Sequence, residues 1–281
     1  MILYNRTKII KRAIWWVVFY TLIFVILGYF LFPVVWTILT SIKTESEAFS
    51  MPPKWIFKPT FENYVSIFTK QPFLRYIMNS VMIGALSTLL ALILGTPAAY
   101  ALSRMKSGKG EGISFFILST RIAPPTLIIL PFFLLYRQIG LYDRKVGLMI
   151  VYLIFNLPFV VWIMKLFFDE IPKELDEAAM VDGCSRMRAF LSIILPLTRS
   201  GLAATSILCM ISSWNEFFFA VTLTGDRAKT LPVAVTSFIQ FTGTRWGELC
   251  AAATVIMIPL IVFGFIVQKN LVAGMTFGAV K

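Results

Sequence analysis

Six long apolar runs constrain the fold of this chain more than any other feature. They are residues 13–39, 77–102, 113–136, 146–168, 193–221 and 249–267. The hydrocarbon core of a bilayer is crossed by about 20 mostly apolar residues in a helix, and each run is long enough for that. The runs are continuous and do not alternate with period two, which favours helices over barrel strands. The sequence therefore predicts an all-α integral membrane protein with six transmembrane helices.

The composition supports a membrane protein. Hydrophobic residues make up 58% of the 281 positions and charged residues only 14%, which is too little charge to cover a soluble domain of this size. The net charge of +12 would suggest nucleic acid binding in a soluble protein, but no nucleic-acid-binding motif accompanies it. Basic residues at the ends of membrane helices orient them and meet anionic lipid head groups. We therefore predict membrane lipid, and no nucleic acid, as a partner.

The order of the runs predicts the topology. Basic residues at Arg6, Lys8, Lys11 and Arg12 favour a cytoplasmic segment at 1–12. The run at 13–39 is too long for a signal peptide and no small-residue cleavage site follows it, so we expect a retained first helix. An extracytoplasmic loop at 40–76 either packs on the outer rim or contacts substrate. With an even number of spans, the C-terminal tail at 269–281 is also expected in the cytoplasm.

Polar residues interrupt three of the apolar runs. Arg121 precedes Pro124 and Pro125, and a proline pair breaks a helix next to a charge that is costly in a membrane. Trp214, Asn215 and Glu216 form the second interruption. Arg121 and Glu216 either pair or gate a pathway, or contact the solute, and Glu216 alternatively lies at a wet outer end. The third, Asn156, either lines a cavity or hydrogen-bonds a neighbouring helix.

Catalytic motifs are missing from the sequence. The chain has no histidine and no G-x-x-x-x-G-K-[ST] phosphate loop, and its three cysteines, Cys184, Cys209 and Cys250, lack metal-ligand spacing. We predict a chain with no catalytic residues, no metal site and no cofactor of its own. Any work driven by ATP would then be done by another subunit.

A polar segment at 169–192 separates the fourth and fifth runs. It contains Glu174 and the series Glu177, Ala178, Ala179, three residues, and Gly183, and after nine more residues it leads into Ile193, Leu195 and Pro196. The small residues would let another surface approach closely, and glycine permits a turn. The acidic first turn suits a helix N-terminus. The segment predicts two short helices that dock on a soluble partner.

The pattern E-A-A-x3-G-x9-I-x-L-P resembles the signature loop of ABC importer permeases. Further matches are Thr120–Pro125, Phe155–Pro158, Ile171–Leu175, Trp214–Phe217, Thr230–Val233 and the ending Gly278–Lys281. The resemblance as a whole covers the chain from about Phe32 to its end. The sequence is similar to carbohydrate-type (type I) importer permeases, in particular to the second permease subunit of maltose-type systems. This resemblance implies the type I permease fold, with an ABC transmembrane domain at 73–268.

The resemblance also implies a set of partners. These are a homologous permease, two ATPase subunits that bind ATP and magnesium, an extracytoplasmic solute-binding protein and a carbohydrate, here expected to be an oligosaccharide. The loop residues Glu174 to Pro196 named above would couple to the ATPase. Phe241 and Trp246, in the last extracytoplasmic loop, would contact the binding protein. The expected location is the cytoplasmic membrane of a bacterium or archaeon.

Three alternatives to sugar import remain open at this point. The same importer class also carries polyols and glycerol phosphate compounds. In a secondary transporter, Arg121 and Glu216 would serve an ion or solute path, although six spans without an evident inverted repeat disfavour it. A membrane enzyme is opposed by the missing catalytic motifs.

Overall fold

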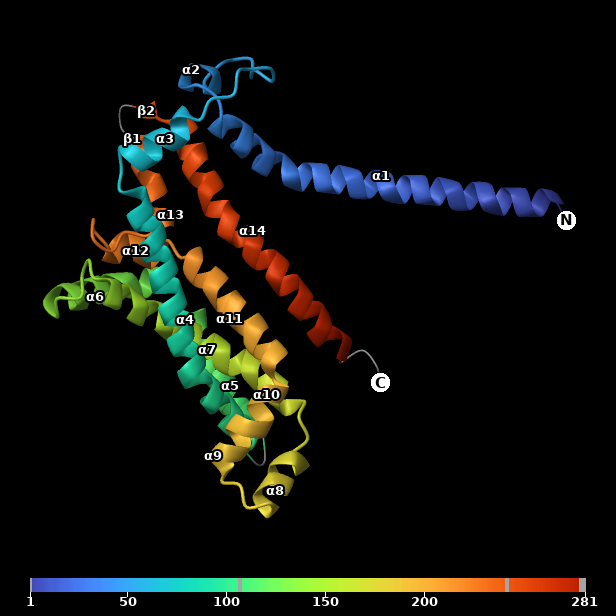
Figure 1. Ribbon diagram of the computed structural model, residues 1–281, viewed down its shortest axis with the longest axis vertical. Coiled ribbons are helices and arrows are strands. Elements are labelled where there is room, and N and C mark those ends of the chain that lie inside the picture. Colours follow the sequence, from blue (N-terminus) through green and yellow to red (C-terminus); the bar gives the residue numbers. More distant parts are fainter. Residues whose placement is uncertain (1, 106–107, 241–242, 278–281) are drawn as a thin grey trace. The chain divides into compact units, whose positions relative to one another are not determined.

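The computed structural model describes residues 2–105, 108–240 and 243–277, which are almost entirely helical (Figure 1). Two compact units make up the chain. Unit 1 consists of Met1–Gln71 and Phe238–Val255, and unit 2 of Pro72–Ser237 and Ile256–Lys281. The last helix, α14 (Trp246–Phe277), contributes residues to both units.

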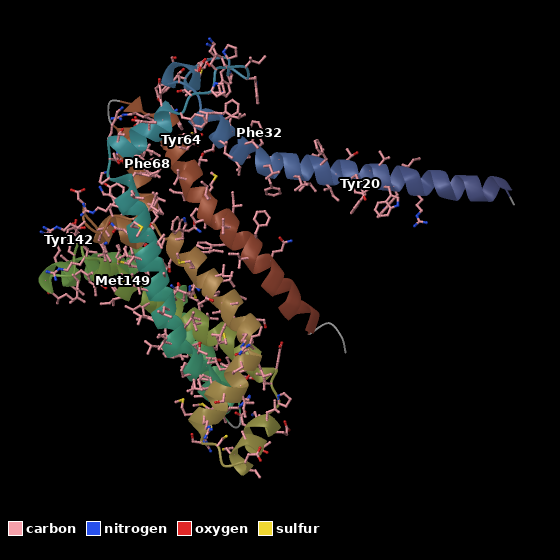
Figure 2. All side chains as sticks on the ribbon, in the orientation of Figure 1. Tyr20, Phe32, Tyr64, Phe68, Tyr142 and Met149 are labelled. Carbon is pink, nitrogen blue, oxygen red and sulfur yellow. The ribbon has the colours of Figure 1, made fainter. Side chains whose placement is uncertain are left out.

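Unit 1 is built around a long first helix and two short ones. They are α1 (Ile2–Ser41), α2 (Glu45–Ala48) and α3 (Glu62–Thr69), joined by the strand pair β1 (Ile239–Gln240) and β2 (Gly243–Thr244) and the start of α14. Figure 2 shows Tyr20 and Phe32 projecting from α1, and both side chains are exposed. An apolar helix that exposes aromatic rings suits a lipid environment rather than water.

Polar contacts order the segment that follows α1. The Asn63 side chain donates to the backbone oxygens of Ser41 (2.9 Å) and Lys43 (2.7 Å). Glu45 accepts from the backbone N–H groups of Trp246 (2.9 Å) and Gly247 (3.2 Å), which begin α14. The expected loop at 40–76 therefore contains α2, α3 and the first residues of α4, and its polar side chains hold the N-terminus of α14.

Unit 2 contains the remaining helices. In chain order they are α4 (Phe73–Ser103), α5 (Lys109–Ser119), η1 (Thr120–Ile122), α6 (Pro125–Gln138), α7 (Lys145–Asp169), α8 (Glu174–Val181), α9 (Arg186–Ala189), the π-helix η2 (Phe190–Ile194), α10 (Leu195–Leu197), α11 (Arg199–Trp214), α12 (Phe218–Leu223) and α13 (Leu231–Val235). The 3₁₀ turn η3 (Thr236–Phe238) follows at the border with unit 1. Helices α4, α7 and α11 form the centre of unit 2, with α8 and α9 at one end, at the bottom of Figure 1.

Small residues allow the central helices to approach closely. A side chain at Gly95 of α4 would lie 2.7 Å from the Val160 side chain of α7, so only glycine fits there. One apolar cluster packs around Val160, Met164 and Phe168, and a second around Val151 and Phe219. These clusters fix the helix ends from which the polar loops emerge.

Four helices among the described residues are long and apolar enough to cross a membrane alone. They are Ile14–Ser41, Phe73–Ser103, Lys145–Asp169 and Trp246–Ile266, each close to a predicted span. Two bent pairs, Lys109–Ile122 with Pro125–Gln138 (79°) and Arg186–Leu197 with Arg199–Trp214 (78°), raise the number to six if each pair is one span.

Both runs at 113–136 and 193–221 are bent pairs of helices, and only the break in the first was predicted from the sequence. Pro124 and Pro125 lack backbone N–H groups, and Ala123 before them is extended, so the first run breaks there. The second run bends at Thr198, shortly after Pro196, and breaks again between Trp214 and Phe218. The proline pair indicated the first break, whereas the bend of the second run at Thr198 and its break after Trp214 were not predicted.

Candidate functional site

The loop between α7 and α11 turns at Gly183. The backbone N–H of Cys184 donates to the Ala179 oxygen (2.9 Å), and that of Gly183 to the Met180 oxygen (3.1 Å). This is the Schellman arrangement that ends a helix with a left-handed residue, and Gly183 has φ +83°. The Ser185 hydroxyl then accepts from the backbone N–H of Arg188 (3.3 Å) and begins α9. The sequence thus folds this loop into two helices, as predicted.

Helix α8 has one face turned into the chain and one turned outward. Asp176 and Ala179, three positions apart, are buried at 8% and 3% exposure. Glu174, Glu177, Ala178 and Val181 follow the i, i+3, i+4, i+7 spacing of a single helix face, and all are exposed. Ala179 therefore packs inside the chain, whereas Ala178 keeps the outer face small.

Large apolar side chains lie exposed on the same loop. Val181 is 87% exposed, Met187 61% and Leu191 53%. No water-facing loop needs three such residues, and exposed apolar groups rimmed by charge mark protein interaction surfaces. The residues Ile193, Leu195 and Pro196 that end the signature are half-buried, and the first two pack against the cluster around Phe168.

Arg121 lies in η1, at the break between α5 and α6. Its guanidinium lies 4.8 Å from the centre of the Phe159 ring on α7 and donates a long hydrogen bond to Ser212 on α11 (3.4 Å). Salt bridges among the described residues do not join Arg121 to Glu216. The pairing considered for these two charges is therefore absent in this structure, and an aromatic ring faces the arginine instead.

Glu216 lies in the break between α11 and α12. Its carboxylate accepts from the backbone N–H groups of Phe219 (2.9 Å) and Ala220 (3.1 Å), the first free donors of α12. The neighbouring Asn215 is exposed, whereas Trp214 is buried and donates to the Ile256 oxygen (3.3 Å). Trp214 therefore packs inside the chain, Asn215 faces outward, and Glu216 caps the N-terminus of α12.

Asn156 is buried in the centre of unit 2. It is 2% exposed, and its amide donates to the Ser213 hydroxyl on α11 (2.8 Å), which lies 3.4 Å from the Ser87 hydroxyl on α4. Three central helices are joined by this polar contact. Of the two interpretations, the structure favours helix joining over cavity lining.

Of the two candidate contacts with a binding protein, one lies on the surface of unit 1. Trp246 is 44% exposed at the first turn of α14. Phe241 lies outside the described residues, between β1 and β2.

Three contacts between residues far apart in the sequence were not predicted. The Asp143 carboxylate accepts from the backbone N–H groups of Gly225 (2.8 Å) and Ala228 (2.9 Å), and Asn79 donates to the Arg227 and Lys229 oxygens. Asp176 contacts Arg104, 72 residues earlier in the chain. The only available signal was a charged or amide residue at the end of an apolar run, which many solvated residues share.

Comparison with known proteins identifies related chains over most of the sequence. The family model described as "Binding-protein-dependent transport system inner membrane component" matches residues 88–277. The trehalose transport system permease protein SugB of Mycobacterium tuberculosis is 39% identical, with 96% of this chain and 98% of the relative covered. The trehalose/maltose transport system permease protein MalG of Thermococcus litoralis is 36% identical, with 89% and 91% covered.

Solved structures match the fold. A bacterial ABC transporter involved in the import of the acidic polysaccharide alginate superposes with a TM-score of 0.75 at 24% identity, covering 92% of this chain and 97% of the other. The same kind of transporter, in complex with an alginate pentasaccharide-bound periplasmic protein, gives 0.66 at 17% identity, with 94% of both chains covered. The predicted all-helical permease fold is confirmed.

Proposed function

Because the chain belongs to the family of inner membrane components of binding-protein-dependent transport systems, and is a multi-pass permease subunit of an ABC importer, we propose that its solute is a carbohydrate. In this proposal the chain forms the pathway together with a homologous permease. Separate subunits hydrolyse ATP, and an extracytoplasmic binding protein delivers the solute. The N- and C-termini lie in the cytoplasm, on the side of the ATPase.

The names of the relatives support the choice of solute. Besides the trehalose and trehalose/maltose permeases, the diacetylchitobiose uptake permease DasC of Streptomyces coelicolor is 31% identical over 89% of this chain. All three names specify small oligosaccharides. A di- or oligosaccharide is therefore the solute class that best fits this chain.

The outward face of α8 carries the proposal for energy coupling. Glu174, Glu177 and Ala178 lie exposed on it, next to the apolar Val181, and the opposite face is held by the chain itself. A short amphipathic helix of this kind fits a groove on a partner, with acidic groups for orientation and apolar groups for affinity. We assign the ATPase to this face, with ATP and magnesium bound by that subunit.

Transport follows from differential binding. An ATPase dimer that holds α8 more tightly in its closed state shifts the permease toward the conformation compatible with closure. Arg121, at the break beside Phe159, and Asn215, exposed at the break after α11, are the polar groups that we place along the pathway. Trp246, exposed at the start of α14, is placed at the contact with the binding protein.

A reconstitution experiment tests this function. The tagged chain is purified with its co-purifying subunits, placed in proteoliposomes with its binding protein, and supplied with ATP and labelled trehalose, maltose or diacetylchitobiose in turn. Uptake of one sugar that requires ATP and the binding protein is expected. Uptake that persists without an ATPase subunit contradicts the proposal, as does an ATP-driven complex that carries none of the sugars but carries a polyol or glycerol phosphate.

A further inference from the structure

A buried ionic contact ties α8 to the end of α4. Asp176 lies on the inward face of α8, and one carboxylate oxygen accepts from the Arg104 Nε at 2.6 Å. The other oxygen accepts from the Tyr100 hydroxyl at 2.5 Å. The side chains of Arg104 and Asp176 are only 15% and 11% exposed. Such a pair is little screened by water, in contrast to an ion pair on the surface.

The same arginine also reaches α7. Its Nη1 donates to the Phe168 oxygen in the last turn of α7 (3.0 Å), and the guanidinium lies 5.5 Å from the Tyr100 ring. A carbonyl in the last turn of a helix attracts a cation, so this contact is favourable. The remaining nitrogen, Nη2, is buried and has no hydrogen-bond partner among the described residues. Without Asp176 the guanidinium would keep only the Phe168 oxygen.

Aromatic rings extend the contact to the other arm of the loop. The Tyr100 ring lies 5.6 Å from that of Phe168 on α7 and 4.8 Å from that of Phe190 on η2. Phe168 and Phe190 are themselves 6.1 Å apart. One cluster therefore joins the long central helices α4 and α7 to α8 and η2, which lie in the first and second arms of the loop.

We propose that Arg104, Asp176 and Tyr100 are positioning residues that make α8 move as one body with α4 and α7. The proposal rests on the proposed docking of the ATPase on α8. The short segment Glu170–Lys173 is the covalent link from α7 to α8, and a helix held by such a link alone would yield when pulled. With the cluster intact, displacement of α8 is passed to α4 and α7 and opens the pathway. Without it, ATP is hydrolysed while the central helices stay in place.

The test uses the full complex in proteoliposomes, with binding protein and labelled trehalose or maltose, whichever the native complex takes up. Asp176→Asn keeps the size of the side chain and removes its charge, Tyr100→Phe removes one hydroxyl, and Asp176→Glu restores a carboxylate. Asp182→Asn, an exposed acid on the same loop, is the matched control. Three quantities are measured: ATPase subunit retained per permease, ATP hydrolysed, and sugar transported.

We expect Asp176→Asn to retain the ATPase and to hydrolyse ATP within about threefold of the native rate, while sugar moved per ATP falls at least fivefold. Tyr100→Phe should lower this ratio about twofold, Asp176→Glu should recover part of it, and Asp182→Asn should leave it unchanged. An unchanged ratio in both Asp176→Asn and Tyr100→Phe overturns the proposal. So does loss of the ATPase from Asp176→Asn together with an unchanged ratio in Tyr100→Phe, which would make the cluster a support for docking alone. Failure of the native chain to retain any ATPase would instead refute the proposed function.

Discussion

The carboxylate of Asp143 accepts a hydrogen bond from the backbone N–H of Ala228, at 2.9 Å, across 85 positions of sequence. The N–H groups of Gly225 and Arg227 point to the same carboxylate. Asp143 has φ +55°, and a side chain at Gly225 would lie 3.0 Å from it. An acid in a left-handed turn and a glycine that makes room for it together tie the loop after α12 to the turn before α7.

This contact makes stability depend on pH. Burial acts to raise the pKa of Asp143, but the N–H groups of Ala228, Arg227 and Gly225 and the charge of Arg227 outweigh it, so the pKa is lowered. A lowered pKa stabilises the fold above the ordinary aspartate value of about 4 and loses this effect as the pH falls through the folded value. Asp143→Asn should thus lower the melting temperature at pH 7.

The melting temperatures of the native protein and the Asp143→Asn variant, measured from pH 7 to pH 3, check the direction of this pH dependence. Asparagine tolerates the left-handed conformation, so the substitution isolates charge from backbone strain. The difference in melting temperature in detergent should shrink below about pH 4. Asp226→Asn, which replaces an exposed acid paired with Lys229, should give no such difference. A gap that stays constant with pH would contradict the role of the charge.

Substitutions of Gly183 can distinguish a requirement for its backbone conformation from a requirement for a small side chain. Nothing lies within 4 Å of a side chain built there, so the chain itself has room, but φ +83° strains any residue with a Cβ. The cost is about 1–2 kcal/mol for alanine and less for asparagine. If the turn alone matters, Gly183→Asn should retain more ATPase subunit than Gly183→Ala. If the docked partner fills the space, Asn should be the worse variant.

We expect Gly183→Asn to retain less ATPase subunit than Gly183→Ala, because the outer face of α8 is the proposed docking surface. Co-purification of the ATPase with each variant in detergent measures it, with the amount of inserted permease as the reference. Equal retention in both variants and in the native chain would remove Gly183 from the docking surface.

Asn156 provides a test of the core. Its buried contact with Ser213 should contribute about 0.6 kcal/mol, as measured for polar contacts between membrane helices. Asn156→Ala should lower stability by about that amount or somewhat more, since the Ser213 hydroxyl then keeps only its long contact with Ser87. Uptake per folded complex should stay within twofold. Ser206→Ala is the matched control, because the Ser206 hydroxyl donates to backbone oxygens of its own helix.

A double-mutant cycle with Ser213→Ala isolates the contact. A coupling free energy near zero between the two substitutions would contradict a stabilising role for the contact. So would a large loss of uptake without a loss of stability, which would assign Asn156 to the solute pathway instead.

The sequence predicts some elements well because their causes are local. The apolar runs end at the helix ends to within a few residues at Phe73–Ser103 and Lys145–Asp169, since bilayer thickness and hydropathy set both limits. Gly183 indicated a turn because glycine is the residue that most readily adopts the left-handed backbone conformation, here with φ +83°. The break at Pro124 followed from the missing N–H groups.

Other features depend on contacts that no local pattern encodes. Asp176 looked like any acidic residue of a first helical turn, and its partner Arg104 like any basic residue at a membrane end. Ala178 and Ala179 are adjacent in sequence, yet the first is exposed and the second buried, and only the position of α8 against the chain decides which. Opposite charge suggested a pair of Arg121 and Glu216, whereas each is satisfied by a neighbour, one by a ring and one by backbone N–H groups.

Substitutions of Glu216 distinguish a helix cap from an ion pair with Arg121. As a cap of α12, its carboxylate should contribute about 1 kcal/mol through the N–H groups of Phe219 and Ala220. Glu216→Gln keeps one oxygen acceptor and should cost less than Glu216→Ala. We expect Glu216→Ala to insert normally and to lower uptake, because α12 then loses its start beside the break in the pathway. Uptake and thermal unfolding are measured together for both variants.

The pairing alternative makes a different prediction for the same variants. If Arg121 and Glu216 meet during transport, Arg121→Ala combined with Glu216→Ala should be less damaging than the sum of the two single changes. With Glu216 as a cap and Arg121 over Phe159, the two effects should add within about 0.5 kcal/mol. Glu216→Gln would then resemble the native chain more than Glu216→Ala does, since the cap needs an oxygen acceptor while a pair needs the charge. Equal damage from both variants, with clear coupling to Arg121, would restore the ion pair and remove the cap as the reason for this residue.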